Sequence, residues 1–190
     1  MNYKALKINN FIEDGYKVIP IRKKDLESIR IWRNAQMNVL RQKIELSSDD
    51  QKQYFKTSII PLFELDNPEQ ILFSFFKDSD LIGYGGLVHI SWVDKRAEMS
   101  FLVDNRRSEN NDQYSKDLHG FIKLMKKLCF TEMKFNRLFT ETYVFRTFHI
   151  KTLELAGFVR EGRMRQHIYE NNKFHDSIIH SILREKYDEK

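Results

Sequence analysis

The sequence predicts an α/β (α+β) domain built on a mixed, mostly antiparallel sheet with helices packed on it. Three observations predict this class. Short β-rich runs follow one another, one long helical segment carries a continuous apolar stripe, and a strand-helix-strand succession spans residues 99–144. Because only such a crossover joins parallel strands, the other strands are expected to pair antiparallel.

The predicted elements are about seven strands and about four helices. The strand segments are 18–21, 70–77, 81–92, 96–104, 137–144, 158–170 and 173–184. The helical segments are 25–34, 47–59, 114–133 and 147–157, with Asp25, Ser47 or Ser48, and Thr147 as expected N-caps. Asn171 and Asn172 tolerate the positive φ angles of a two-residue hairpin turn, so they are expected to join the last two strands.

The composition fits one domain over residues 1–190, with residues 1–16 as a polar lead-in. Thirty-two basic and twenty-seven acidic side chains give a net charge of +5, and no block of like charge calls for nucleic acid. No segment approaches the roughly 18 apolar residues of a membrane span, and no signal peptide is recognisable. The single cysteine, Cys129, lies on the apolar stripe, which favours a buried structural thiol in a cytoplasmic protein.

The turn before the long helix is the first candidate ligand site. In a parallel crossover this turn places the helix N-terminus, with its exposed N–H groups, beside the end of the preceding strand, where a phosphate is favoured. Arg106 and Arg107 supply positive charge there, and Asn110 and Asn111 can adopt left-handed conformations. An ordinary polar loop whose acidic residues suit the helix dipole is the alternative interpretation.

The last third of the chain resembles a known family. Its motifs are Gly157-Phe158 with Glu161-Gly162 and Arg165, then Lys173 to Asp176, and Leu183 to Tyr187. In this order they resemble the end of the GCN5-related N-acetyltransferases (GNAT), in the branch that includes the ribosomal-protein acetyltransferases. Gly83 to Leu87 is similar to a glycine motif on the third strand of that family.

A second resemblance lies upstream. Trp32-Arg33-Asn34, Arg41 and the segment from Asp50 to Phe55 resemble the opening of acetyltransferases that act on nucleotide-linked amino sugars in bacterial surface-glycan synthesis. Together the two resemblances span about residues 18–187. They imply a GNAT fold, acetyl-CoA as co-substrate without a metal, and Trp32, Arg33 and Arg41 as contacts of the acceptor.

The resemblance also implies where acetyl-CoA binds. Phe101, Leu102 and Val103 correspond to the bulged strand whose backbone polarises the thioester, and Arg146 opens the helix that faces the CoA sulfur. The glycine-rich phosphate loop of the family is missing, because residues 105–113 contain no glycine. The arginines and asparagines of this turn are therefore the expected replacements.

The catalytic groups must be reassigned, because the family's usual tyrosine acid is replaced by Leu153. His149 is the candidate general acid, since a histidine with a pKa near 6.5 suits proton donation, and Tyr143 is the second choice. A capping or packing role is the alternative for His149.

The attacking amine must be neutral, so a base is also needed. Glu98 and Glu141 lie on predicted central strands and are the candidate bases. The alternative is a structural salt bridge from either carboxylate to Arg96, Arg107 or Arg137. His89 and His167 are further candidates for substrate contact, although exposed strand residues are often only solvated.

The leading hypothesis is therefore acetyl transfer from acetyl-CoA, by direct attack of an amine, to an amino sugar linked to a nucleotide. One alternative is a protein N-terminal acetyltransferase of the ribosomal-protein type, and another is a non-catalytic CoA-binding or scaffold protein on the same fold. The expected partner is a small-molecule amine. A homodimer, in which the partner is a second copy of the chain, is also compatible with the fold. No nucleic acid, membrane or metal is expected.

Overall fold

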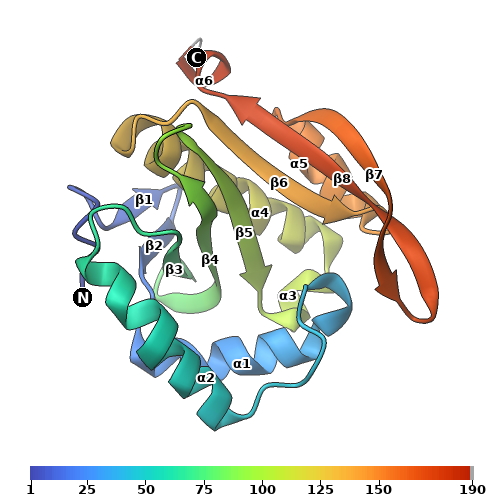
Figure 1. Cartoon of the computed structure of the whole chain (residues 1–190), viewed down its shortest axis with the longest axis horizontal. Helices are drawn as coiled ribbons and strands as arrows, with labels where there is room; N and C mark the ends of the chain where they lie inside the picture. Colours follow the sequence, from blue (N-terminus) through green and yellow to red (C-terminus); the bar gives the residue numbers. More distant parts are fainter. Residues whose placement is uncertain (189–190) are drawn as a thin grey trace.

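The central element is one sheet of eight strands in the order β1-β2-β3-β4-β5-β6-β8-β7 (Figure 1), within the residues 1–188 that the computed structural model describes. The strands are β1 (Phe11–Glu13), β2 (Tyr16–Pro20), β3 (Ile71–Lys77), β4 (Asp80–Ser91), β5 (Arg96–Val103), β6 (Arg137–Tyr143), β7 (Val159–Glu170) and β8 (Lys173–Leu183). Neighbouring strands pair antiparallel except β5 and β6, which are parallel. The mixed sheet and its one parallel crossover are thus confirmed.

Helices connect these strands within the described part of the chain. They are α1 (Leu26–Ala35), α2 (Ser48–Tyr54), α3 (Asn105–Ser108), α4 (Asn111–Lys126), α5 (Thr147–Leu155) and α6 (Glu185–Asp188). Short 3-10 or π turns at Lys23–Asp25, Met37–Val39, Phe55–Ile59, Ile60–Glu64 and Lys127–Glu132 extend or link them. In Figure 1, α4 and α5 run behind the sheet, and α1 and α2 lie together along its lower edge. None of the described helices has the length and apolar character that crossing a bilayer requires.

Local chemistry explains where several elements begin and turn. Ser47 caps α2 in a reciprocal capping box with Asp50, as one of the two expected caps. Asn171 and Asn172 adopt φ angles of 51° and 57° in the β7–β8 turn, as predicted. The predicted cap at Thr147 is wrong: Arg146 occupies the N-cap position of α5 and makes no side-chain cap.

The hydrophobic core lies between α4 and the sheet, and phenylalanine rings dominate it. Phe121 of α4 packs edge-on against Phe75 of β3 and tilted against Phe101 of β5, with ring centroids 5.1 Å and 5.0 Å apart. Such pairs contribute about 1 kcal/mol beyond the area that they bury. Gly120 lets α4 approach closely, because a Cβ there would lie 2.4 Å from the ring of Tyr16. The predicted apolar stripe is therefore the sheet-facing side of this helix.

The first sixteen residues differ from the polar lead-in that the composition predicted. Tyr3, Leu6 and Phe11 are buried, and Tyr3 exchanges two hydrogen bonds with the main chain of Leu72, at 3.0 Å and 2.9 Å. Phe11–Glu13 forms β1, which raises the strand count from about seven to eight. Widely spaced apolar residues among polar ones give no periodic signal, so the sequence pattern does not reveal this strand.

β5 and β6 pair only at their beginnings, and this feature creates the site. The parallel register covers Arg96 to Glu98 on β5 and Arg137 to Phe139 on β6, and no further pairing follows. The strands then diverge, while β5 stays paired to β4 as far as Val103. In the β4–β5 pairing, β4 is bulged between Val88 and Ser91, where His89 adopts a φ of 47°.

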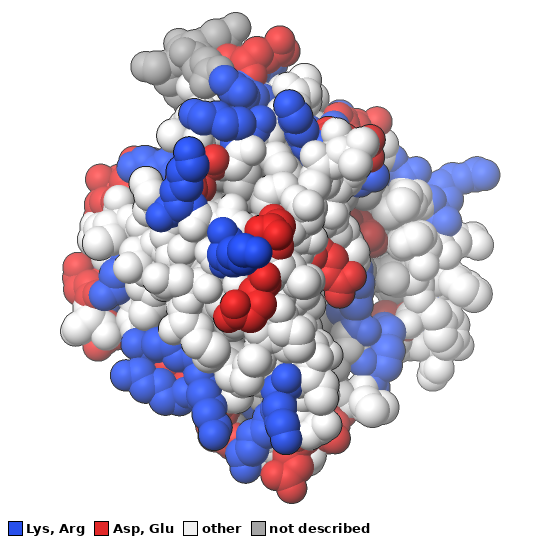
Figure 2. All heavy atoms as spheres, turned by 60° about the vertical axis from the view of Figure 1, so that its left-hand side comes forward, with Lys and Arg blue, Asp and Glu red and all other residues white. Residues whose placement is uncertain are grey.

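The surface charge is mixed rather than concentrated. On the face shown in Figure 2, Lys and Arg side chains alternate with Asp and Glu, and white surface separates them. The net charge of +5 is thus distributed over small groups of both signs on that face.

Candidate active site

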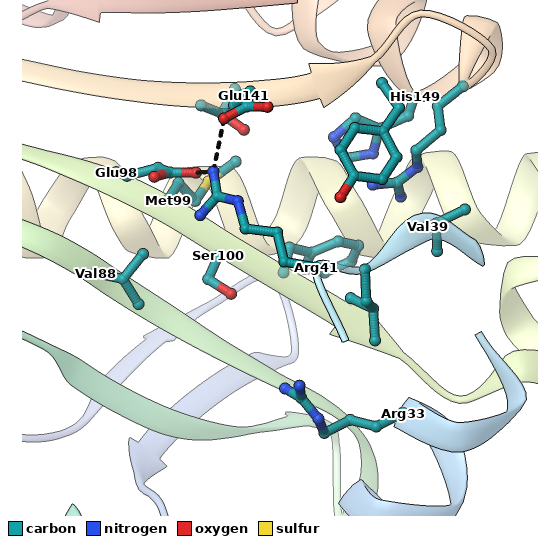
Figure 3. A pocket seen from close by; sticks show the side chains of 14 residues that line it. Arg33, Val39, Arg41, Val88, Glu98, Met99, Ser100, Glu141 and His149 are labelled. Atoms are coloured by element: carbon teal, nitrogen blue, oxygen red, sulfur yellow. Dashed lines mark hydrogen bonds and ion pairs between the residues drawn. The ribbon is translucent and has the colours of Figure 1, made fainter. Parts of the chain in front are cut away.

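A pocket of about 180 Å³ opens where β5 and β6 separate. The two strands, the start of α5 and the segment after α1 supply most of its lining, and Arg33 of α1 and Val88 of β4 complete it. Figure 3 shows Glu98, Met99 and Ser100 from β5, Glu141 from β6, His149 from α5, and Val39 and Arg41 from the segment after α1. The crossover topology therefore gathers residues that lie more than 100 positions apart in the sequence.

The free edge of β5 offers main-chain hydrogen-bond groups to this pocket. The carbonyl of Lys95 accepts hydrogen bonds from the start of β6, whereas the N–H of Asp104 donates to Ile82 beside β4. Because main-chain groups alternate sides along a strand, those of Met99 and Phe101 face β6. The last bridge, between Glu98 and Phe139, uses the N–H of Met99, so the carbonyl of Met99 and both groups of Phe101 lie beyond the pairing. Val103 faces the same side, but Leu102 faces β4, so its expected main-chain contact with acetyl-CoA does not fit its orientation.

Two carboxylates face each other across the opening. Glu98 of β5 and Glu141 of β6 both accept hydrogen bonds from one atom, Nη2 of Arg41, at 2.9 Å and 2.8 Å. Glu98 also contacts Nδ1 of His89 at 2.6 Å, and Glu141 lies 3.6 Å from Nε2 of His167. Both glutamates are nearly buried, whereas the imidazoles are 62% and 46% exposed in their side chains. Four residues that the sequence proposed separately thus form one cluster around Arg41.

The salt-bridge partners proposed as alternatives for these glutamates pair elsewhere. Arg96 contacts Asp94, Arg107 contacts Asp117, and Arg137 contacts Glu161. The two site carboxylates are therefore held by a cation that the sequence pattern had assigned to the acceptor instead.

Tyr143 brings a hydroxyl group to the same pocket. The side chain is buried, and its oxygen has no hydrogen-bond partner in the protein. Burial raises the pKa of the phenol, so it stays protonated at neutral pH. An unpaired buried hydroxyl is costly, which indicates that a ligand or a water completes it.

His149 lies at the inner end of the pocket in a chain of three polar groups. Arg146 donates to the Tyr114 oxygen at 3.0 Å, and this oxygen lies 2.5 Å from Nδ1 of His149. Because a guanidinium only donates, the Tyr114 hydrogen is free to be donated to Nδ1. Burial first, then the neighbouring Arg146, lower the pKa of His149 well below 6.5. The lowered pKa keeps the ring neutral at neutral pH, so the expectation of a pKa near 6.5 is wrong. A Tyr114 hydrogen donated to Nδ1 would leave the ring hydrogen on Nε2.

A second groove of about 340 Å³ leads from this point to the start of α4. Arg146, His149 and Tyr114 line one end of it, and Ser108 and Asn111 line the other. It connects the opening between the strands with the helix N-terminus where the sequence predicted a phosphate.

The predicted phosphate-binding side chains are largely used within the protein. Arg107 forms a two-pronged pair with Asp117, whose side chain is 0% exposed. Arg106 pairs with Asp104 but keeps 83% of its side chain exposed. Asn110 caps α4 by accepting from Gln113. Only Arg106 thus keeps an accessible guanidinium, and Asn111 lines the groove itself.

The residues proposed to hold the acceptor divide into two groups. Trp32 is 6% exposed within the hydrophobic core and does not line the pocket. Arg33 does line it and contacts the Tyr84 hydroxyl and Gln42. In Figure 3, Arg33 points into the cavity from the side opposite Glu98 and Glu141.

A third cavity, of about 320 Å³, adjoins the first through Arg33, Val88 and Ser100. Most hydrogen-bonding side chains of this cavity are neutral, namely Gln51, Tyr54, Gln70, Tyr84 and Ser100. Asp50 adds one carboxylate to its lining.

Tyr114 is a functional candidate that the sequence pattern missed. It was predicted only as one position of the apolar stripe of its helix, because an aromatic residue at helical spacing is usually packing. Its hydroxyl contacts residues 32 and 35 positions away, and no local pattern encodes such a contact. Gln42 and Tyr84, which hold Arg33, were missed for the same reason.

Comparison with known proteins agrees with this geometry. Residues 19–179 match the model of the acetyltransferase (GNAT) domain. No curated protein matches the chain significantly in sequence. The fold is similar to spermidine N-acetyltransferase from Vibrio cholerae in complex with CoA and spermine, with a TM-score of 0.80, 18% identity, and coverage of 92% of this chain and 99% of that one.

The same Vibrio cholerae enzyme in a dodecameric intermediate state aligns with a TM-score of 0.74 and 18% identity, over 92% of this chain and 97% of that one. At such identities the likeness concerns the fold. Neither structure comes from the ribosomal-protein or amino-sugar branch that the sequence motifs resemble.

Proposed function

Because the chain belongs to the GNAT acetyltransferase family and is an acetyl-CoA-dependent N-acetyltransferase, we propose that it acetylates the primary amine of a nucleotide-linked amino sugar by direct attack. One observation carries the direct-attack chemistry of the proposal. The opening between β5 and β6 brings unpaired main-chain groups, an unpaired hydroxyl and two carboxylates to one pocket. These are the groups that polarisation of a thioester, protonation of a thiolate and deprotonation of an amine require.

The strand edge is the proposed holder of the acetyl-pantetheine end. The N–H groups of Phe101 and Val103, together with the carbonyl of Met99, face the opening, and the two N–H groups are positioned to donate to the pantetheine amides and the thioester oxygen. Donors fixed by the sheet stabilise negative charge on that oxygen as the amine attacks, without reorganising. Bound acetyl-CoA supplies the activated acetyl group, and the reaction needs no acyl-enzyme. The buried thiol of Cys129, whose pKa burial raises to about 12, is not a nucleophile at neutral pH.

Glu98 is the proposed base. Its second oxygen is bonded to His89, which reaches solvent, so a proton taken from the amine has an outlet. Glu141 also faces the pocket and orients the amine from the opposite strand. The carboxylates of two diverging strands thus approach the amine from both sides.

Tyr143 is the proposed donor to the departing thiolate, and His149 supports it. The phenol is protonated at neutral pH and has no partner to give up. Neutral His149 offers its Nε2 hydrogen as a hydrogen-bond donor rather than as a titrating acid. Leu153 stands where relatives carry a tyrosine, and Tyr143 supplies the same functional group from the end of β6.

The amino-sugar acceptor rests on the cavity beside Arg33. Its neutral amide and hydroxyl groups suit the hydroxyls of a sugar. Arg33, which lines this cavity, and Arg41, which lines the adjoining pocket, suit the phosphates of a nucleotide. A polyamine would instead favour several carboxylates without internal partners. One observation favours a polycation, namely the Glu98–Glu141 pair, so spermidine is the second candidate acceptor.

The test measures acetylation of a matched panel of amines, with release of the CoA thiol as the readout. The panel is a nucleoside-diphosphate amino sugar, spermidine, and a peptide with a free N-terminus. We expect kcat/KM to be highest for the nucleotide-linked amino sugar. A higher kcat/KM for spermidine or for the peptide would make that compound the acceptor instead of the amino sugar. Failure of the protein to bind acetyl-CoA would favour a scaffold role.

A further inference from the structure

Arg41 holds the two carboxylates of the site in an unusual way. A single nitrogen, Nη2, donates to Glu98 at 2.9 Å and to Glu141 at 2.8 Å (Figure 3). The structural arginines bind differently: Arg107 uses two nitrogens on Asp117, and Arg137 uses two on Glu161. Arg41 therefore lacks the two-pronged geometry that makes arginine pairs strong.

The position of this nitrogen is the one that an acceptor ammonium needs. An –NH₃⁺ group is a compact donor of three hydrogens, and two carboxylate oxygens at about 2.8 Å suit it well. The unpaired hydroxyl of Tyr143 lines the same pocket and is buried, so a polar ligand is expected there independently of the carboxylates. Nη2 of Arg41 thus occupies a position that suits an ammonium nitrogen.

The remainder of Arg41 is suited to leaving. Its side chain is 52% exposed, and it follows a short 3-10 turn rather than lying on a strand or helix. The neighbouring Gln42 is held by Arg33 and Asn34, so the main chain is fixed while the side chain of Arg41 reaches out from it. Displacing the guanidinium breaks no other hydrogen bond described for that side chain.

We propose that Arg41 is an internal competitor that occupies the ammonium site formed by Glu98 and Glu141, and that the acceptor amine displaces it on binding. The inference rests on the proposed function and adds the site of the acceptor nitrogen. It also selects the acceptor, because an amine must outcompete a tethered guanidinium to bind. Once displaced, the guanidinium is free to meet an anionic part of the acceptor.

The proton then follows a path that the structure already contains. The ammonium between the carboxylates gives one proton to Glu98, and the neutral amine forms the new C–N bond as the C–S bond breaks. Glu98 passes that proton to His89 at 2.6 Å, and the exposed imidazole releases it to solvent. The CoA thiolate takes its proton from Tyr143, and Tyr143 regains one from the nitrogen, which loses its second proton as the amide forms.

The experiment measures binding of a simple amine, glucosamine, to the enzyme saturated with acetyl-CoA or with CoA. Wild type, Arg41→Ala, Arg41→Lys and Lys43→Ala are compared by calorimetry and by the carboxylate carbon shifts of labelled glutamate. Lys43 is the matched control, because it lies on the same segment but pairs with Glu170 outside the pocket. If Arg41 occupies the site about nine-tenths of the time, removing it tightens glucosamine binding about tenfold.

We expect this tightening in Arg41→Ala, little change in Arg41→Lys, and none in Lys43→Ala. In Arg41→Ala alone, millimolar guanidinium ion should compete with glucosamine. Unchanged or weaker glucosamine binding in Arg41→Ala would overturn the proposal. Because the readout is binding, it is separate from the function: a wild type that acetylates no amine refutes the proposed function, whereas these affinities decide the role of Arg41.

Discussion

Two regions of this protein were expected to bind acetyl-CoA, and they differ in what they leave free. The turn between β5 and α4 carries positive charge, but its arginines pair with Asp104 and Asp117 and its asparagine caps the helix. The opening between β5 and β6 carries little net charge, yet the Tyr143 hydroxyl and the edge of β5 from Phe101 onward have no partners on the β6 side. Charge in a sequence is therefore not the same as charge available to a ligand.

The largest effect is expected in the turn and concerns stability. Arg107→Ala leaves the fully buried carboxylate of Asp117 without its cation, although Tyr16 and Gln113 still donate to it. Breaking such a buried pair costs about 3 kcal/mol. Urea unfolding should show this loss, while acetyl-CoA affinity of the folded variant changes little. A large loss of affinity with intact stability would return Arg107 to the binding site.

The opening should respond in rate rather than in stability. Glu98→Gln removes the proposed base and should lower kcat by about a hundredfold, within the usual range for general-base catalysis. Acetyl-CoA affinity, measured by calorimetry, should be kept. Glu69→Gln, at an exposed residue near His89, is the matched control and should behave as wild type. A Glu98→Gln enzyme with normal kcat would exclude Glu98 as the base.

Tyr143→Phe separates the unpaired hydroxyl from the ring. The loss of the proposed donor to the thiolate should lower kcat about tenfold. Stability should stay equal or rise slightly, because a buried unpaired polar atom is removed. Reduced stability together with unchanged kcat would show a structural role for the hydroxyl.

His149 links the opening to stability through pH. Its pKa is lowered in the folded protein by burial and by Arg146, below the ordinary value of 6.5 that holds when the chain unfolds. As the pH falls, His149 therefore binds a proton in the unfolded state before it does so in the folded state. The contribution of neutral His149 to the free energy of unfolding is complete above pH 6.5 and is lost progressively below it. The loss approaches about 1.4 kcal/mol per pH unit.

Unfolding free energies of wild type and His149→Asn at pH 7.5 and 5.5 isolate the effect, since other groups titrate in both. The wild type should lose more stability between the two pH values than the variant. Equal losses would mean that His149 is charged in the folded state.

The smallest effect belongs to the exposed arginine of the turn. Arg106→Ala should weaken acetyl-CoA binding about twofold to threefold, because a solvent-exposed charge contributes less than about 1 kcal/mol. Stability should change by no more than a few tenths of a kcal/mol. A loss of affinity of a hundredfold would make Arg106 the main phosphate contact and reverse the comparison.

The elements that the sequence predicted well are those with local signals. The periodic stripe of α4, the alternation on β5 and the Asn171–Asn172 turn depend on neighbouring residues, so their positions could be inferred. The position of β1 and the burial of the segment before it could not be inferred, because Tyr3 and Phe11 are buried by contacts with distant strands. Trp32 was assigned to the acceptor from a motif, whereas its apolar area is better used in the core.

The site was predictable in its members but not in its connections. Glu98, Glu141, His149 and Tyr143 were all proposed, and the structure brings them to one pocket. That Arg41 joins the two glutamates, and that Tyr114 holds His149, depends on how loops and helices pack across the sheet. Such pairs leave no trace in spacing along the chain.

The most direct test compares acetyl-CoA with acetyl-pantetheine, which lacks the nucleotide and its phosphates. Both are titrated into the wild-type protein by calorimetry. If the strand opening is the main binding region, acetyl-CoA binds with micromolar affinity and acetyl-pantetheine follows within about tenfold, since each lost surface charge contact contributes less than about 1 kcal/mol. Acetyl-pantetheine that fails to bind at millimolar concentration, while acetyl-CoA binds tightly, would contradict this and make the turn before α4 the dominant site.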